Sequence, residues 1–194
     1  MPINDFLRYV STIMPIDSYD ATTLINLLRA VSVSKGRLLE KEKRKVDTLY
    51  FVVEGYVRVY FVDDGEEITT ELVGPGGLVT AFESFVTGHP SRERVSALSD
   101  CVLIAIDKAS YHQLLSNTLV WRHVCKQTYE HLIQSLRERT LDFRMLTAEQ
   151  RYQKLLSEQP EVYQNVPLKF IASYLGVTPE TLSRIRRCGA LRLK

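Results

Sequence analysis

Cysteine is scarce in this sequence, and no pattern marks its few cysteines as structural or metal-binding residues. Cys101, Cys125 and Cys188 are the three present among 194 residues, and they lie far apart without a CxxC spacing. We therefore expect neither a disulfide framework nor a zinc or iron–sulfur site. The four histidines form no metal set either, so we expect reduced cysteines, no metal and no resident cofactor.

Long apolar runs, leader segments and enzyme signatures are missing as well. No stretch approaches the roughly 20 apolar residues that a membrane span needs, and residues 1–12 lack a basic segment followed by an apolar one. The phosphate-binding patterns GxGxxG and GxxxxGK[ST] and the nucleophile pattern GxSxG do not occur. These absences predict a cytoplasmic protein that is not an enzyme and has no membrane partner.

The net charge of +2 is unevenly distributed along the chain. Residues 137–194 contain eleven Lys and Arg against six Asp and Glu, a balance of +5, whereas residues 1–136 contain fourteen against seventeen, a balance of −3. This asymmetry favours an anionic partner for the C-terminal part.

The hydrophobic pattern changes twice along the chain. Residues 17–31 place leucines and a valine at helical spacing, and Asp17 or Asp20 is a candidate cap. From Gly36 to Ile106, short Val-, Ile-, Tyr- and Phe-rich segments alternate with turn signals, which indicates an antiparallel sandwich or barrel. After Ile106 the pattern becomes helical again, beginning with a short helix capped by Asp107.

A long helix is predicted over residues 118–144, because this segment contains neither proline nor glycine. Its mostly apolar stripe predicts a dimer seam made of Trp121, Cys125, Thr128, Leu132, Leu136, Thr140 and Phe143. The alternative is that the stripe packs on the protein's own barrel, and each arrangement can hold along a different part of the helix.

Residues 147–187 predict a helix followed by a helix-turn-helix. Thr147 and Gln150 form a capping box, and Pro160 ends the helix that the box begins. In the stretch PLKFIASYLGVTPETLSRIRR, residues 167–187, Gly176 suits a left-handed helix end and Thr178-Pro179 suits the start of the next helix.

The second of these helices presents a polar, basic outer face. Arg184 can pair with a guanine and Glu180 can accept a hydrogen bond from a cytosine amine. The other predicted DNA contacts are Thr178, Thr181, Ser183, Arg187, Arg186 and Lys169. The alternative is a pair of packed helices with a solvated charged face.

The chain resembles the Crp/Fnr superfamily of transcription regulators over roughly residues 15–190, and it looks most like the short regulators common in Bacteroidetes. The motif IASYLGVTPETLSRIRR carries the resemblance, above all Glu180, Ser183 and Arg184. The resemblance implies an α+β fold: an antiparallel jelly-roll β-barrel with flanking helices, a long dimerisation helix and a small helical C-terminal domain. It implies a cyclic-nucleotide-binding-like sensor domain (1–115), the dimerisation helix (116–145) and a helix-turn-helix domain (146–194). It also implies double-stranded DNA, a second copy of the chain and RNA polymerase as partners.

Two features depart from the family's pattern. The family's nucleotide-binding segment places a glutamate on the ribose and an arginine on the cyclic phosphate, but these positions fall on Ala81 and Ser91 here. The effector pocket implied by the resemblance comprises Ala81, Phe82, Glu83, Ser84, Ser91, Arg92, Leu136 and Arg137. We therefore expect an effector other than cyclic AMP bound in the usual way, or none.

The second departure is the small number of residues that follow the last predicted helix, where many relatives continue into a β-hairpin wing. A different class of function therefore stays open. In it, the protein is a ligand- or protein-binding sensor or scaffold with a degenerate, wingless helix-turn-helix.

Overall fold

The computed structural model describes residues 2–192, and it describes side chains through residue 188. Two helices, α1 (Pro2–Ile13) and α2 (Ser18–Leu27), precede the strands. The strands are β1 (Arg29–Val33), β2 (Leu38–Glu40), β3 (Thr48–Glu54), β4 (Val57–Asp63), β5 (Glu66–Val73), β6 (Leu78–Val79), β7 (Arg94–Ala97) and β8 (Cys101–Asp107). The remaining helices are α3 (Phe82–Thr87), α4 (Lys108–Asn117), α5 (Leu119–Met145), α6 (Ala148–Glu158), α7 (Pro160–Asn165), α8 (Leu168–Leu175) and α9 (Pro179–Arg192).

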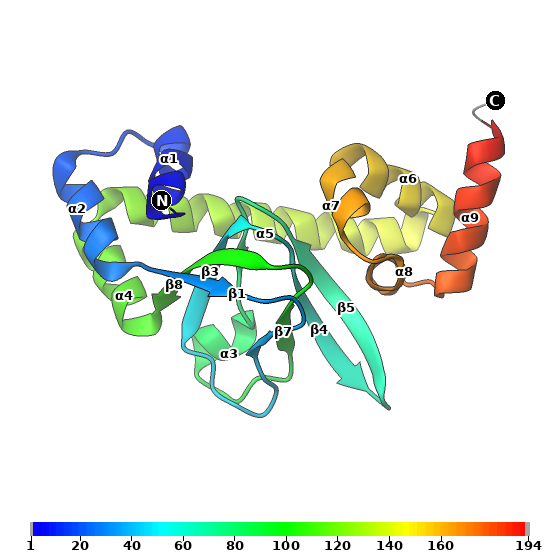
Figure 1. The fold of residues 1–194 in the computed structure, drawn as a ribbon, viewed down its shortest axis with the longest axis horizontal. Helices are drawn as coiled ribbons and strands as arrows, with labels where there is room; N and C mark the ends of the chain where they lie inside the picture. Colours follow the sequence, from blue (N-terminus) through cyan, green and yellow to red (C-terminus); the bar gives the residue numbers. More distant parts are fainter. Residues whose placement is uncertain (1, 193–194) are drawn as a thin grey trace.

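The strands form two four-stranded antiparallel sheets, ordered β1-β8-β3-β6 and β2-β7-β4-β5. Side chains alternate between the two faces of each strand. In β4, Val57 and Val59 belong to the apolar core of the barrel, whereas Arg58 and Tyr60 are buried outside that core. The predicted antiparallel barrel with flanking and C-terminal helices is confirmed (Figure 1).

The N-terminal region differs from its prediction in two ways. The helix expected over residues 17–31 ends at Leu27, and Val31 instead lies in β1 opposite Leu103 of β8. Strand pairing with β8 outweighs the helical spacing of these residues. The preceding helix α1 was not predicted, although Phe6 and Val10, four residues apart, are both fully buried.

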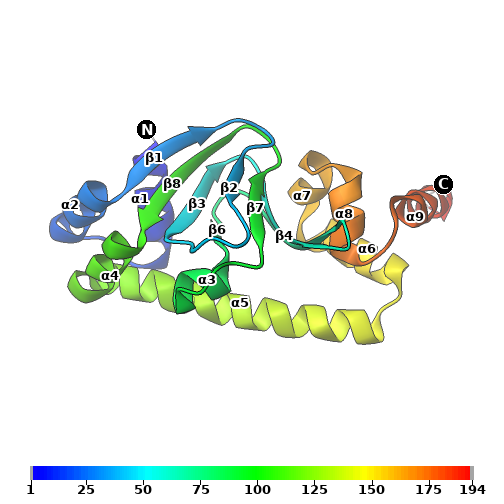
Figure 2. The same ribbon diagram turned by 90° about the horizontal axis from the view of Figure 1, so that it is seen from below.

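Helix α5 begins at a side-chain cap and is anchored in the barrel. The Thr118 hydroxyl accepts a hydrogen bond from the Trp121 N–H at 3.3 Å, and Trp121 is fully buried. The indole lies 6.0 Å from the Tyr111 ring and 6.3 Å from the Phe6 ring, measured between centroids. From this anchor α5 runs along the barrel and continues past it to the C-terminal helices (Figure 2).

The C-terminal helices share a second apolar cluster, in which Ile171 and Leu182 are fully buried. Tyr56 and Leu98 of the barrel belong to the same cluster, so these helices pack on the barrel's outer surface. The predicted capping box of Thr147 and Gln150 is confirmed. Pro160 follows the end of α6, as predicted, and is itself the first residue of α7, a position that needs no backbone N–H.

Candidate nucleic-acid interface and barrel pocket

The turn between α8 and α9 is built around Gly176. This residue has φ +69°, and its N–H donates to the Ser173 carbonyl at 3.1 Å. The next N–H, that of Val177, returns to the Ala172 carbonyl at 3.0 Å. This pattern ends a helix in the left-handed conformation that glycine adopts at least cost. A β-carbon on Gly176 would also lie 2.7 Å from the Phe143 ring.

Helix α9 begins at a side-chain cap two residues after the turn. The Thr178 hydroxyl accepts a hydrogen bond from the Thr181 N–H at 3.2 Å, and Pro179 is the first helical residue. Leu182 is fully buried and Ile185 packs against the same cluster. These two side chains fix which face of α9 points away from the protein.

The outward face of α9 contains most of the predicted DNA-contacting residues. Thr178, Glu180, Arg184 and Arg187 are exposed, and Thr181 and Ser183 are half-buried. A hydrogen bond from its own backbone N–H lowers the pKa of Glu180, with a further contribution from Thr178, so the carboxylate is charged at neutral pH. The remaining predicted contacts are Lys169, exposed on α8, and Arg186, exposed on α9 with its guanidinium carbon 5.3 Å from the Tyr163 ring centroid.

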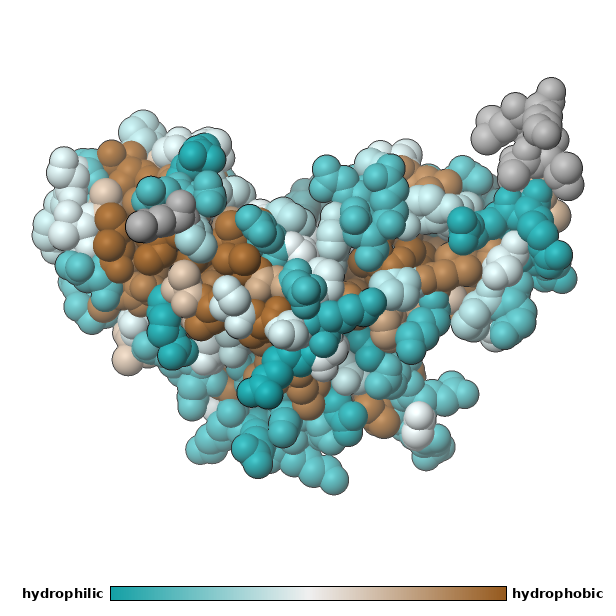
Figure 3. All heavy atoms as spheres, in the orientation of Figure 1, coloured by the Kyte–Doolittle hydropathy of each residue, from teal (hydrophilic) through white to brown (hydrophobic). Residues whose placement is uncertain are grey.

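Helix α9 lies at the end of the molecule farthest from α1 and α2 in both ribbon views (Figures 1 and 2). Hydrophilic side chains gather over this end in the space-filling view (Figure 3). A protruding helix with a cationic outer face has the shape and charge of an element that enters the major groove of DNA.

Two arginines that hold the turn in place were not singled out from the sequence. Arg151 donates to the Leu175 carbonyl from two nitrogens, at 3.2 and 3.1 Å, and to the Leu146 carbonyl at 2.8 Å. Arg139 donates to the Thr70 carbonyl in β5 and to the Tyr174 carbonyl in α8. Their sequence signal was only a positive charge, because their partners are backbone carbonyls that sequence does not mark.

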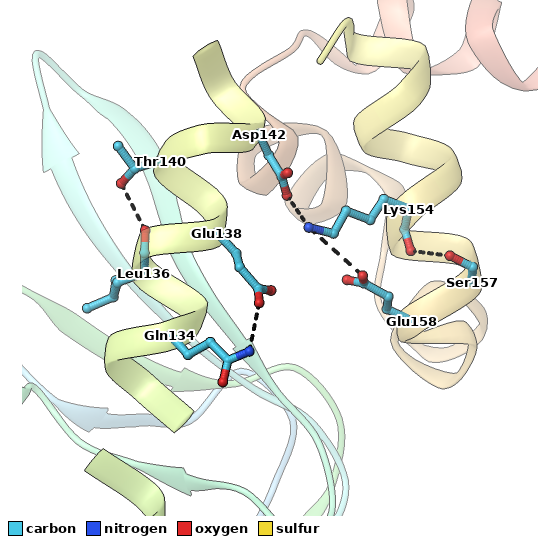
Figure 4. Close-up of polar contacts among 8 residues, drawn as sticks. All are labelled: Gln134, Leu136, Glu138, Thr140, Asp142, Lys154, Ser157 and Glu158. Carbon is cyan, nitrogen blue, oxygen red and sulfur yellow. Dashed lines mark hydrogen bonds and ion pairs between the residues drawn. The ribbon is translucent and has the colours of Figure 1, made fainter. Parts of the chain in front are cut away.

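An ion pair fixes the corner between α5 and α6. The Lys154 ammonium lies 2.7 Å from the Asp142 carboxylate and 3.9 Å from that of Glu158 (Figure 4). The Asp142 carboxylate raises the pKa of Lys154. Leu136 and Thr140 project from α5 on the side away from α6 (Figure 4).

The predicted dimer stripe on α5 divides into two parts. Trp121 and Cys125 are buried against the protein's own barrel, and Thr128 and Leu132 are half-buried. Leu136 is 52% exposed, and Thr140 and Phe143 are exposed as well. Ile133, adjacent to this stripe, is 68% exposed.

The segment predicted from the resemblance to hold the effector forms the end of β6, helix α3 and the start of β7. Ala81 is fully buried before α3, and Glu83 is exposed. The Ser84 hydroxyl is used internally, donating to the His89 carbonyl at 2.5 Å and accepting from the Val46 N–H at 3.0 Å. Phe82 packs edge-on against Tyr129 of α5, with 5.8 Å between ring centroids.

Ser91, at the position of the family's arginine, brings no positive charge to this segment. The Ser91 hydroxyl closes a turn by donating to the Glu93 carbonyl and accepting from the Glu93 N–H, both at 2.9 Å. Arg92 is exposed, and Arg94 makes two 2.5 Å hydrogen bonds to Glu42. The predicted pocket residues Leu136 and Arg137 are exposed on α5.

Carboxyl groups occupy the region instead. Burial raises the pKa of Glu93 to about 7, and the Glu71 and Glu83 carboxylates add to the rise. Burial also raises the pKa of Glu71, and the Arg139 guanidinium opposes that rise. These groups offer a phosphate no positive charge, and in their ionised form they repel it.

A small apolar cavity lies between the barrel and α5. Its volume is about 50 Å³, and Glu71, Phe85, Tyr111, Cys125 and Tyr129 are among the residues that line it. Sites for drug-sized ligands occupy about 300–1,000 Å³. Burial raises the pKa of Cys125 to about 11, so its thiol is neutral.

A membrane-spanning helix and a metal site have requirements that the described residues do not meet. Among the helices of residues 2–192, none combines the length and the apolar character that a membrane crossing needs. Within the same residues, no group of three or more His, Cys, Asp and Glu side chains is placed to hold a metal ion.

Comparison with known proteins finds relatives of the barrel. Residues 30–118 match the family model of the cyclic nucleotide-binding domain. The cAMP-dependent protein kinase regulatory subunit of Eremothecium gossypii is 32% identical over 102 residues, which are 52% of this chain and 21% of that protein. This chain therefore spans about a fifth of the length of that curated relative.

Solved structures resemble nearly the whole chain. The structure of FixK2 from Bradyrhizobium japonicum has a TM-score of 0.73 at 19% identity, covering 85% of each chain. A structure described as a transcriptional regulator of the Crp/Fnr family, from Eubacterium rectale, has a TM-score of 0.70 at 16% identity. It covers 95% of this chain and 88% of that one. At these identities the likeness shows the fold.

We predict that Gly176→Ala lowers the free energy of unfolding more than Gly36→Ala does. The left-handed backbone costs about 1–2 kcal/mol for a residue with a β-carbon, and contact with Phe143 adds to this cost. Urea unfolding followed by circular dichroism measures the loss. Gly36→Ala is the matched control, because Gly36 has φ +80° with no atom within 4 Å of an added β-carbon. Equal losses in the two variants would contradict the role of Phe143.

We also predict that Glu93→Gln stabilises the protein at pH 8 and has little effect at pH 4.5. The folded-state pKa is above the unfolded value, so the native carboxyl retains its proton and stability falls as pH rises from about 4.5 to about 7. Glu93 is partly exposed, and solvent screening reduces the expected gain to about 1–2 kcal/mol. Thermal melts at both pH values test this, with the exposed Glu54→Gln as control. A gain of equal size at the two pH values would contradict it.

Proposed function

We propose that this chain, in which a cyclic nucleotide-binding domain at residues 30–118 forms part of the Crp/Fnr fold, is a homodimeric transcription regulator that binds duplex DNA through α9. It acts in the cytoplasm, with a sensor domain (1–115), a dimerisation helix (116–145) and a helix-turn-helix domain (146–194). Contact with RNA polymerase is part of the same proposal.

The single observation that carries the proposal is the outward face of α9. Thr178, Glu180, Arg184 and Arg187 are exposed together on a helix whose opposite side is held by the buried Leu182. Arg184 suits a bidentate contact with guanine, and Glu180 suits a cytosine amine. Arg187 and the α8 residue Lys169 suit the phosphates, which set the register of the helix on the duplex.

The exposed part of α5 supports a homodimer. Ile133, Leu136 and Phe143 lie on one side of the helix, together with Thr140. Exposed apolar side chains at helical spacing favour a second helix of the same kind. A two-fold dimer would present its two α9 helices about 34 Å apart, and its DNA site would be nearly palindromic.

We further propose that the effector of the barrel is not a cyclic nucleotide held in the family's usual way. Ala81 and Ser91 occupy the positions of the usual glutamate and arginine, and the Ser91 hydroxyl is engaged by Glu93. Glu71 and Glu93 place carboxyl groups, rather than a positive charge, close to this segment.

We predict that Arg184→Ala weakens binding to the preferred duplex by about 1–3 kcal/mol and relaxes base preference at one position in each half-site. Duplexes selected from a random pool by the unaltered protein supply the probe, and gel shifts at several salt concentrations give the affinities. Arg8→Ala, on the exposed side of α1, is the matched control. Unchanged affinity and preference would contradict the role of Arg184. No affinity for any duplex at modest ionic strength would favour the sensor or scaffold function instead.

For the dimer, we expect Ile133→Glu to produce monomers at concentrations where the unaltered chain is dimeric, because it would place two carboxylates in an apolar seam. Sedimentation velocity measures the change. Ile25→Glu introduces the same charge at another exposed apolar position, on α2, and should leave the dimer intact. If both variants sediment as the unaltered chain does, α5 is not the seam.

A further inference from the structure

A second cleft lies outside the barrel, between its outer surface and the start of α8. Its volume is about 520 Å³. The barrel supplies one wall, including Lys35, Arg58 and Ser96, and the start of α8 supplies the other, including Pro167, Lys169 and Phe170. Neither the DNA-contacting face of α9 nor the cavity beside α5 includes these barrel residues.

Arg58 is the central residue of this cleft. It is 5% exposed, and its guanidinium carbon lies 3.8 Å from the Tyr60 ring centroid and 3.9 Å from that of Phe170. Two of its nitrogens have partners, because Nε donates to the Ser96 hydroxyl at 3.3 Å and Nη2 pairs with Glu67. Its Nη1 atom is buried without a hydrogen-bond partner among the described residues.

An unmatched donor on a buried cation is costly, and an anion is the group that would satisfy it. The lining contains three cations, Arg58, Lys35 and Lys169, against one carboxylate, that of Glu67. No side chain caps the N-terminus of α8, where Pro167 lies at the cleft. The positive end of that helix dipole adds to the same field.

We propose that this cleft binds a small oxyanion with several negative charges, of the phosphate or carboxylate kind, through Arg58, Lys35 and Lys169. Because one wall belongs to the barrel and the other to α8, the bound anion would bridge the two. Lys169 is shared with the proposed DNA contacts, whereas Arg58 and Lys35 are not, and the test of the site requires no DNA.

Isothermal titration of the full-length protein with inorganic pyrophosphate, and separately with citrate at equal ionic strength, tests the proposal. We expect saturable binding of one anion per chain by at least one of the two, and the pair identifies which chemistry is preferred. The double variant Lys35→Ala, Lys169→Ala should bind at least tenfold more weakly, since both lysines are exposed and their removal leaves the Arg58 stack intact.

The double variant Lys41→Ala, Lys126→Ala removes the same charge at exposed positions outside the cleft and should bind as the unaltered protein does. If both double variants bound the anion equally weakly, the loss would be an effect of net charge, and the proposed site would be wrong. If neither pyrophosphate nor citrate bound saturably, the proposal would also be wrong. Arg58 would then be only a structural contact between the barrel and α8. DNA binding of the unaltered protein, in which Lys169 is present, reports separately on the proposed function.

Discussion

The burial of Trp121 is the contact on which the rest of the arrangement depends. It anchors α5 among Phe6 and Tyr111 at the barrel core, so the helix leaves the barrel in one direction. The C-terminal helices are attached along the far part of α5 and on the outer face of β5. The position of α9 therefore follows from a hydrophobic contact at the opposite end of the chain's longest helix.

The proposal of an unusual effector depends on the charged groups of the barrel. A phosphate site needs donors that are free to turn toward the ligand. Here Arg94 is paired with Glu42, Arg92 is exposed, and Glu71 and Glu93 are half-buried carboxyl groups. Among the described residues, a buried guanidinium nitrogen without a hydrogen-bond partner is found instead on the outer face of the barrel, on Arg58. The chain thus has the fold of its structural neighbours, with the unpaired buried guanidinium nitrogen on the outer face of the barrel and carboxyl groups beside the predicted effector segment.

Local features were predictable from the sequence because their causes are local. The Thr147 capping box, the Asp107 cap and the Gly176 turn each depend on residues a few positions apart, and each is present. The barrel was predictable as a class because alternating strands and turn residues recur at regular spacing.

Features that depend on distant pairing were not predictable. Val31 continues a helical pattern, yet its partner Leu103, 72 positions later, makes it a strand residue. In the sequence, Arg58 has the pattern of an exposed polar residue on a strand. It is buried because Phe170, 112 positions later, packs against it together with Tyr60. Arg139 and Arg151 bind backbone carbonyls, which have no signature in the sequence. Helix α1 shows that two well-spaced apolar residues are too weak a signal by themselves.

The contact between Phe143 and Gly176 has a mechanical consequence. Between Trp121 and Phe143, α5 rises about 33 Å at 1.5 Å per residue, and it contains no proline or glycine at which it would bend. It therefore connects the barrel core, at Trp121, with the turn at Gly176, which Phe143 contacts. A tilt of α5 by about 5° about Trp121 would move Phe143 by about 3 Å, which is close to the 3.4 Å rise of one base pair. If α9 lies in a major groove as proposed, a tilt of this size would move it along the duplex by about one base pair.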